Sequence, residues 1–322
     1  MSLHRIVFLD AETLGLASLD TRALASSELD NIGAKITLFD HTLPEEVAER
    51  IKHATAILVN KVVLNADMLR EASALQYIGV TATGMNNIDL DYCKANGIQV
   101  RNVTAYGTDS VAQHTLTLLL NLATRFVQYQ DDVRAGKWSA SSHFCLSSHA
   151  VVELADKHAV IVGHGELGKR VEVLLKALGM QVSIAARPGK KNDTRPSLAS
   201  LLPQADVVTL HCPLTNDTKQ LIDEKALSLM KPSAFLINTA RGGLIDERAL
   251  LNALENQEIG GAGLDVLSVE PPPLDHILIK ANLPNLLVSP HNAWVGIKAR
   301  QTLLDTTLAQ LKAFISDADK AI

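Results

Sequence analysis

The stretch Ala159-Val-Ile-Val-Gly163-His-Gly165-Glu-Leu-Gly168-Lys-Arg-Val171 decides the fold of this chain. Its apolar residues predict a buried strand, its GxGxxG spacing predicts a turn, and the residues after the turn predict a helix. In such a turn the first glycine permits the sharp bend, the second lets the backbone approach a pyrophosphate, and the third lets the helix pack on the strand. The pyrophosphate would rest on the helix N-terminus, held by main-chain amides and by the helix dipole. The residues predicted to bind a dinucleotide here are Gly163, Gly165, Glu166, Leu167 and Gly168; the alternative is a purely structural glycine-rich turn.

The end of the next predicted strand indicates which dinucleotide binds. An NAD site usually places Asp or Glu about 20 residues after the turn, to accept hydrogen bonds from the ribose hydroxyls. Here the strand runs into Ala185-Ala-Arg187-Pro-Gly-Lys190-Lys191, which contains no carboxylate. Because Arg187 and its basic neighbours suit a 2′-phosphate, the sequence favours NADP(H) over NAD(H). The alternative is a solvated basic turn at the rim of the site.

Apolar runs separated by helical patterns continue on both sides of this turn. Strands that alternate with helices predict an α/β protein with parallel sheets and crossover connections. The predicted strands before the turn are Ile6–Leu9, Ile36–Phe39, Ala56–Val59, Tyr77–Val80 and Ile98–Val100. From the turn onward they are Ala159–Val162, Val182–Ala185, Val207–Leu210, Ala234–Asn238, Gly261–Val266 and Leu286–Val288.

Two longer helices are predicted outside these strand-rich regions. The spacing of Val111, Thr115, Leu118, Leu122 and Phe126 predicts one continuous helix from Asp109 to Val133. A second amphipathic helix is predicted for Ala299–Ile315. The apolar face of the first helix is typical of a bridging or dimer-forming helix.

Size and charge limit the classes of protein that this sequence can encode. At about 150 residues per domain, 322 residues predict two domains. The net charge is −5, with 30 basic and 35 acidic residues, and no basic block is present, so we expect no nucleic-acid partner.

Cysteines and apolar segments exclude further classes. Cys93, Cys145 and Cys212 are too scattered for a disulfide framework or a metal knuckle, so we expect no bound metal. Asp10 and Glu12 interrupt any signal-peptide core, and no run approaches the roughly 20 apolar residues of a membrane span. We therefore expect a cytoplasmic protein without a membrane partner.

Three polar residues downstream of the glycine turn each follow a predicted strand. They are Arg241, Glu270 and His291. In a doubly wound fold the ligand crevice lies beyond the carboxyl ends of the strands, so all three are expected at one crevice. Hydride transfer to a keto acid needs a cation for the carboxylate, a proton donor for the developing alkoxide, and a group that keeps the donor protonated. Each residue by itself also fits a structural role, but the three together supply these functions.

With these residues assembled, the chain resembles the D-isomer-specific 2-hydroxyacid dehydrogenases along essentially its whole length. Within that family it is most similar to the glycerate dehydrogenases, also called hydroxypyruvate reductases. Besides the glycine turn, the motifs that carry the resemblance are Val7–Asp10, Val59–Val62, Ala82–Gly84, Thr108–Thr115, His211–Thr215, Asn238–Gly243, Gly263–Val266 and Ser289–His291. The main departure is Ala186-Arg187, where many relatives carry an acidic residue.

The resemblance implies a role for each matching position. Arg241 binds the substrate carboxylate, and His291, paired with Glu270, donates the proton. Asp265 holds the nicotinamide carboxamide. The residues implied to line the cofactor are His211, Cys212, Pro213, Thr239, Ala240, Arg241 and His291. Those implied for the substrate, besides Arg241 and His291, are Lys61, Thr83 and Gly84, with a plain surface lysine as the alternative for Lys61.

The resemblance also implies the architecture: two Rossmann-like doubly wound domains, with the nucleotide-binding domain inserted in the substrate domain. The implied boundaries are 1–104 and 292–322 for the substrate (catalytic) domain and 105–291 for the NAD(P)-binding domain. The helix from Asp109 would carry the contact of a homodimer. Trp138, Phe144 and Trp294 match aromatic positions near the substrate or across the dimer, with a core role as the alternative.

These observations predict an NAD(P)-dependent oxidoreductase that reduces hydroxypyruvate or glyoxylate to D-glycerate or glycolate. One alternative is another small 2-keto acid, or a phosphorylated one, as substrate. A second alternative is a corepressor-like binding protein that senses the dinucleotide; the complete Arg241, Glu270 and His291 set speaks against it.

Overall fold

The computed structural model describes residues 4–24, 33–190 and 192–320. The chain forms two compact units. The terminal unit contains the chain up to Gly107 together with the segment from Val295 onward, and the central unit is Thr108–Trp294. Each unit is built around its own parallel sheet, which confirms the predicted α/β class.

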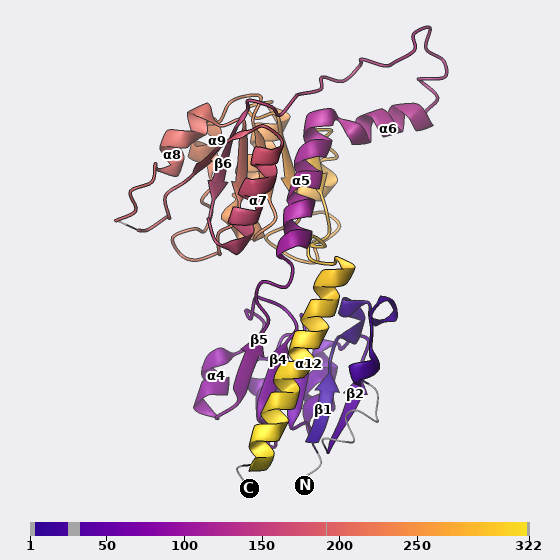
Figure 1. Cartoon of the computed structure of the whole chain (residues 1–322), viewed down its shortest axis with the longest axis vertical. Coiled ribbons are helices and arrows are strands. Elements are labelled where there is room, and N and C mark those ends of the chain that lie inside the picture. Colours follow the sequence, from indigo (N-terminus) through magenta and orange to yellow (C-terminus); the bar gives the residue numbers. More distant parts are fainter. Residues whose placement is uncertain (1–3, 25–32, 191, 321–322) are drawn as a thin grey trace. The chain divides into compact units, whose positions relative to one another are not determined.

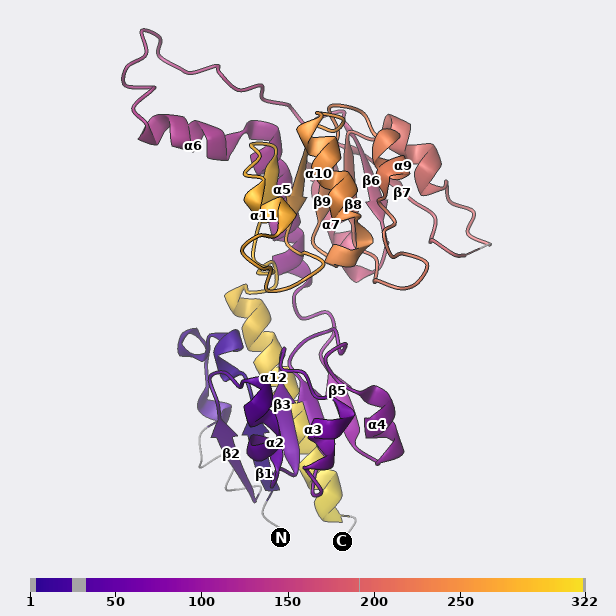
Figure 2. The same ribbon diagram turned by 180° about the vertical axis from the view of Figure 1, so that it is seen from behind.

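The terminal unit has a five-stranded parallel sheet in the order β2-β1-β3-β4-β5. Its strands are β1 (His4–Phe8), β2 (Ala34–Leu38), β3 (Ala56–Val59), β4 (Tyr77–Val80) and β5 (Gln99–Asn102). Its α-helices are α2 (Val47–Ile51), α3 (Ala66–Arg70), α4 (Leu90–Ala95) and α12 (Ile297–Lys320). Helix α12 covers one face of the sheet, and α2 and α3 cover the other (Figures 1 and 2). The strand order reverses between β1 and β3, so the carboxyl ends of these two strands form a switch point where α/β folds bind ligands.

The central unit has a six-stranded parallel sheet in the order β11-β10-β9-β8-β6-β7. Its strands are β6 (His158–Val162), β7 (Gln181–Ile184), β8 (Val207–Leu210), β9 (Phe235–Asn238), β10 (Gly261–Leu264) and β11 (Leu286–Val288). Its α-helices are α5 (Thr108–Thr124), α6 (Phe126–Arg134), α7 (Glu166–Ala177), α8 (Leu198–Leu201), α9 (Glu224–Ser228), α10 (Glu247–Glu255) and α11 (Ile277–Lys280). The order reverses at β6, the strand that enters the glycine turn.

Helices cover both faces of the central sheet because its strands are apolar on both sides. Ala159 and Ile161 of β6 pack in one core with α5 and α7, whereas Val160 and Val162 pack in the other core with α9 and α10. Figure 1 shows α5 and α7 in front of this sheet, and Figure 2 shows α10 and α11 on its opposite side. Continuous apolar strands of this kind are typical of parallel sheets covered on both faces.

Short 3-10 helices complete the described elements. They are η1 (Ala11–Leu14), η2 (Leu16–Ser18), η3 (Arg22–Leu24), η4 (Pro44–Glu46), η5 (Leu202–Gln204) and η6 (Gly242–Leu244).

The predicted continuous helix from Asp109 to Val133 is wrong in one respect: it breaks at Arg125. Arg125 has a left-handed φ of 54° and separates α5 from α6. Its guanidinium Nη2 donates to the main-chain oxygen of Gly260 at 3.4 Å, a contact with a distant loop that the periodicity does not contain. After the break, Phe126 is 56% exposed instead of continuing the apolar face, and α6 leads away from the central sheet (Figures 1 and 2).

Candidate active site

The glycine turn between β6 and α7 places its three glycines in three different environments. Gly163 has a φ of +98°, and a Cβ there would lie 2.6 Å from the main chain of His211. A Cβ on Gly168 would lie 2.1 Å from the main-chain oxygen of Gly163, so the helix packs directly on the turn. A Cβ on Gly165 would have nothing within 4 Å. The open approach to the α7 N-terminus therefore lies over Gly165, and it fits a pyrophosphate held by main-chain N–H groups.

The turn after β7 is less basic than its local sequence indicates. Arg187 is exposed, and its main-chain N–H donates to Asp193 Oδ2 at 2.9 Å. The guanidinium of Arg195 binds the same carboxylate and holds the pKa of Asp193 well below its usual range. A second carboxylate, that of Asp217, lies beside Gly189. Lys191, which the sequence analysis placed in this turn, lies outside the described residues.

Arg241 lies in the loop that follows β9, and the buried side chain of Asn238 holds this loop. Asn238 Oδ1 accepts from the N–H of Ala240 at 3.0 Å, and Nδ2 donates to the main-chain oxygen of Arg241 at 2.9 Å. Arg241 is half-buried, and its Nη1 donates to the main-chain oxygen of Ala240 at 2.6 Å. The guanidinium carries five N–H groups, so it keeps donors for an anionic ligand.

Glu270 and His291 follow β10 and β11, and their side chains form a short hydrogen bond. His291 Nδ1 lies 2.6 Å from Glu270 Oε2, with the two side chains 25% and 34% exposed. Glu270 Oε1 accepts from the N–H of Leu267 at 2.9 Å, which fixes the carboxylate against its own loop. His291 has a φ of +51°, a left-handed conformation that is uncommon for a residue with a side chain. Since Nδ1 faces the carboxylate, Nε2 is the nitrogen that can face a ligand.

The loops after β9 and β10 are packed tightly together at Gly242. A Cβ on Gly242 would lie 2.0 Å from the main-chain carbon of Leu267, so only glycine fits at this contact. β9, β10 and β11 are neighbours in the sheet, and their carboxyl ends meet at one edge. The structure therefore brings the loops of Arg241, Glu270 and His291 to one edge of the central sheet.

Asp265 is a buried carboxylate that ties the end of β10 to the turn containing His291. Its side chain is 1% exposed. Oδ1 accepts from Ser289 Oγ at 2.6 Å and from the N–H of Asn292 at 3.0 Å, and Oδ2 accepts from the N–H of Ala293 at 2.9 Å. These three hydrogen bonds satisfy a buried carboxylate that would otherwise be costly.

The remaining predicted cofactor residues follow β8 and β9 at the same edge of the sheet. His211 Nε2 lies 2.9 Å from Thr209 Oγ1, and burial lowers the pKa of His211 to about 3. Burial raises the pKa of the Cys212 thiol to about 11, and Pro213 is exposed. Thr239 Oγ1 lies 3.0 Å from Thr115 Oγ1 on α5.

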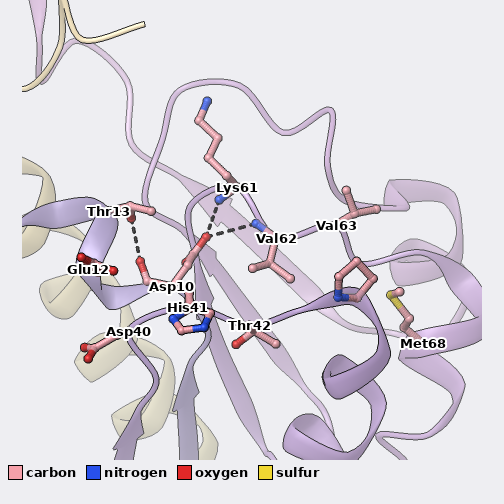
Figure 3. A pocket seen from close by; sticks show the side chains of 11 residues that line it. Asp10, Glu12, Thr13, Asp40, His41, Thr42, Lys61, Val62, Val63 and Met68 are labelled. Atoms are coloured by element: carbon pink, nitrogen blue, oxygen red, sulfur yellow. Dashed lines mark hydrogen bonds between the residues drawn. The ribbon is translucent and has the colours of Figure 1, made fainter. Parts of the chain in front are cut away.

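Three predicted substrate residues belong to the terminal unit. Lys61 is exposed and follows β3, and Thr83 and Gly84 follow β4. Thr83 Oγ1 donates to the main-chain oxygen of Val103 at 3.0 Å. Lys61 lies at a pocket of about 530 Å³ over the switch point of this sheet, together with Asp10 (Figure 3).

The buried carboxylate of Asp10 builds the loop that presents Lys61. Oδ1 accepts from the N–H of Asn60 at 2.8 Å, and Oδ2 accepts from the N–H groups of Lys61 at 2.6 Å and Val62 at 3.1 Å. Figure 3 shows the contacts to Lys61 and Val62. Desolvation raises the pKa of Asp10, although the three N–H groups oppose this shift.

Sequence reasoning assigned no role to the side chains that support the site. Asn238 belongs to the Asn238–Gly243 motif, but the motif by itself does not predict its hydrogen bonds to the Arg241 loop. His114 and Ser289 likewise belong to the motifs Thr108–Thr115 and Ser289–His291. Their hydrogen bond, with His114 Nε2 2.8 Å from Ser289 Oγ, joins residues 175 positions apart, so neither motif predicts it. The sequence signal for such a supporting side chain is a polar residue at the last position of a buried strand, as at Asn238.

Metal sites and membrane-spanning helices were sought in the part of the chain that the structure describes. No three His, Cys, Asp or Glu side chains there come together in a way that could hold a metal ion. No described helix combines the length and apolar character needed to cross a bilayer.

A parallel α/β unit with a glycine turn at its switch point, and an Arg, Glu and His at one sheet edge, is typical of a nicotinamide-dependent dehydrogenase. Residues 116–293 match the family model described as D-isomer specific 2-hydroxyacid dehydrogenase, NAD binding domain. The chain belongs to this family.

Particular relatives match over nearly the whole chain. The chain is 40% identical over 313 residues to a glycerate dehydrogenase of Methylorubrum extorquens, which covers 97% of this chain and 96% of the relative. It is 32% identical to a hydroxypyruvate reductase of Blautia hydrogenotrophica, with 97% of both chains covered. Its structure is similar to that of an NADPH-dependent glyoxylate/hydroxypyruvate reductase of Sinorhizobium meliloti in complex with NADP and malonate. For that pair the TM-score is 0.79 and the identity 25%, with 98% of this chain and 94% of the other covered.

Proposed function

We propose that this protein is a reductase of hydroxypyruvate or glyoxylate that uses NADPH and forms D-glycerate or glycolate. The observation that carries the proposal is the 2.6 Å pair of His291 and Glu270 at the same sheet edge as the Arg241 loop. The names of the relatives support the substrate class, because they include glycerate dehydrogenase, hydroxypyruvate reductase and glyoxylate reductase.

In the proposed mechanism each residue of the sheet edge has one task. A bound, reduced nicotinamide would supply the hydride that the carbonyl carbon of the substrate accepts. Arg241 binds the substrate carboxylate with its guanidinium and polarises the keto oxygen. His291 donates a proton from Nε2 to the developing alkoxide, so that hydride and proton together convert the carbonyl group into an alcohol. Glu270 accepts from Nδ1, which orients the ring and stabilises its protonated form.

The cofactor is assigned to the central unit. The glycine turn, with its open side over Gly165, receives the pyrophosphate at the α7 N-terminus, and Asp265 receives the nicotinamide carboxamide. We assign the 2′-phosphate of NADPH to the turn of Arg187 and Lys190, both of which are exposed. Asp193 and Asp217 lie at the same turn and oppose this preference, so the ratio of NADPH to NADH activity is the direct test.

The terminal unit is assigned to the substrate. Lys61 and the main-chain N–H groups of Thr83 and Gly84 lie beyond the carboxyl ends of β3 and β4, where ligands bind in parallel α/β sheets. We assign these groups to the carboxylate end of the substrate. These groups are expected to bind the substrate and the transition state equally well, so their removal raises KM more than it lowers kcat.

We also propose that the protein forms a homodimer through α6 and the segment that follows it. This segment leads away from the central sheet and exposes large apolar side chains (Figures 1 and 2). The aromatic residues among them are Phe126 at 56%, Trp138 at 51% and Phe144 at 90%. A concentration of exposed apolar side chains marks an interaction surface. Light scattering coupled to size-exclusion chromatography tests the oligomeric state, and a monomer at all concentrations contradicts it.

The enzymatic proposal is tested by following nicotinamide absorbance with hydroxypyruvate, glyoxylate and pyruvate, each with NADPH and NADH. Turnover of hydroxypyruvate or glyoxylate with NADPH supports the proposal. Turnover with NADH alone keeps the reaction and rejects the 2′-phosphate assignment, and turnover of pyruvate alone rejects the substrate.

His291→Ala tests the assignment of the proton donor. This variant is expected to lower kcat strongly and to leave the Kd of the cofactor nearly unchanged, since the proton is transferred only in the transition state. An equal loss of cofactor affinity contradicts the role of His291.

A further inference from the structure

A row of three hydrogen-bonded side chains connects helix α5 to the buried carboxylate of Asp265. His114, in the first half of α5, has its Nε2 2.8 Å from Ser289 Oγ. Ser289 Oγ in turn lies 2.6 Å from Asp265 Oδ1. The same imidazole nitrogen is 3.4 Å from Asp265 Oδ1, and the His114 side chain is only 21% exposed.

The direction of these hydrogen bonds follows from the number of protons. A serine hydroxyl has one proton to donate, and a short contact to a carboxylate is the strongest use of it. Ser289 therefore donates to Asp265, and its oxygen accepts from His114. The Nε2 of His114 must carry a hydrogen, so that a neutral His114 is the Nε2–H tautomer.

The Asp265 carboxylate, at the end of this row, also holds the turn that contains His291. Asp265 accepts from the N–H groups of Asn292 and Ala293, the two residues after His291. Helix α5 contacts this turn a second time, because Ser110 Oγ donates to the main-chain oxygen of Ala293 at 2.6 Å. Ser110 and His114 are one helical turn apart, so one face of α5 supports the whole segment.

We propose that His114 is a positioning residue for the nicotinamide half of the cofactor site. By donating to Ser289 it holds the Asp265 carboxylate in the orientation that receives the nicotinamide carboxamide. The inference rests on the proposed function, which assigns Asp265 to the nicotinamide. The pyrophosphate is assigned instead to the turn between β6 and α7, and the 2′-phosphate to the turn after β7. The loss of His114 is therefore expected to weaken the nicotinamide contacts selectively.

The test compares the whole cofactor with its fragment that lacks nicotinamide. The full-length protein is titrated with NADPH and 2′-phospho-ADP-ribose, and with NADH and ADP-ribose. The pair that the wild-type protein binds more tightly is then used for the variants. His114→Ala is expected to raise the Kd of the dinucleotide roughly tenfold and to change the Kd of the fragment less than about twofold.

Two further variants keep the test decisive if His114→Ala does not fold. His114→Gln keeps a side-chain N–H donor near the position of Nε2 and is expected to restore most of the dinucleotide affinity. Ser289→Ala removes the middle of the row with little change in volume, and it is expected to reproduce the selective loss.

His158→Ala is the matched control. His158 Nε2 also lies 2.8 Å from a serine hydroxyl, that of Ser183, in the same unit. His158 is the first residue of β6, at the opposite end of that strand from the glycine turn, and Ser183 lies within the neighbouring strand β7. We expect its removal to change neither Kd.

Three results overturn the inference: equal weakening of dinucleotide and fragment in His114→Ala, no weakening of either, or the same selective loss in His158→Ala. Failure of the proposed function gives a different result. In that case the wild-type protein binds the dinucleotide but reduces none of the keto acids, and the comparison of dinucleotide with fragment still reports on His114.

Discussion

Replacing Gly165 with alanine separates cofactor binding from the stability of the fold. Gly165 precedes α7 with φ −78° and ψ −159°, a conformation that any residue adopts. A Cβ there meets nothing within 4 Å. The added methyl group would occupy the space that we assign to the pyrophosphate. Gly165→Ala is therefore expected to fold normally and to bind the dinucleotide weakly.

The expected magnitudes follow from these surroundings. At a helix N-cap alanine is worse than glycine by about 0.5–1 kcal/mol, whereas the stiffer unfolded chain of alanine returns about 0.4–1 kcal/mol. The free energy of unfolding should therefore change by less than about 0.5 kcal/mol. Loss of one charge-assisted hydrogen bond to the pyrophosphate costs about 1.5–3 kcal/mol, which raises the Kd of the dinucleotide about 10- to 150-fold.

The assay is a fluorescence titration with NADPH and NADH, paired with urea unfolding of the same preparations. Gly168→Ala is the comparison, because its Cβ would lie 2.1 Å from the main-chain oxygen of Gly163 and must displace the helix. That variant is expected to lose stability as well as affinity. Wild-type affinity in Gly165→Ala would refute the placement of the pyrophosphate over this residue.

Three further predictions address the proton donor, the cofactor preference and the pH dependence. Glu270→Gln is expected to lower kcat about tenfold, because an amide stabilises the protonated imidazole less than a carboxylate and both side chains are partly exposed; steady-state kinetics with an unchanged kcat would contradict this. Arg187→Asp is expected to shift the ratio of kcat/KM for NADPH over NADH about tenfold or more toward NADH, and an unchanged ratio would mean that Arg187 faces only solvent. Burial lowers the pKa of His211 from 6.5 to about 3. Between these values the unfolded chain binds a proton that the folded chain does not. The free energy of unfolding therefore declines as pH falls below 6.5. This decline is at most about 1.4 kcal/mol per pH unit. His211→Gln should flatten the dependence of the unfolding free energy on pH between 6.5 and 4. If the variant and the wild-type protein give parallel plots of unfolding free energy against pH, the lowered pKa of His211 is contradicted.

Much of the fold could be predicted because its signals are local. Each predicted strand overlaps a strand of the structure, and β3, β4, β8 and β11 have the predicted bounds. Parallel strands that are buried on both faces are apolar at nearly every position, so a short apolar run suffices to locate them. The spacing of the glycine turn is also local, since one strand, one turn and one helix contain it.

The helix break and the charge of the cofactor turn could not be predicted in this way. Arg125 interrupts the helix while contacting Gly260, 135 residues away in the sequence. Asp217, in the segment that follows β8, lies beside Gly189, so the turn after β7 has a neighbouring carboxylate that its own sequence does not contain. Periodicity within a window carries no information about such contacts.

The sequence by itself determined the class of fold, the glycine turn and the three strand ends that carry Arg241, Glu270 and His291. These depend on the order of residues along single elements. Only the tertiary structure decided how the chemistry is supported. Asp265 accepts a hydrogen bond from Ser289, and Ser289 accepts one from His114, because β10, β11 and α5 pack together. Hydrogen bonds between distant segments depend on packing in three dimensions, and a buried charge selects its partners only after the sheet has formed.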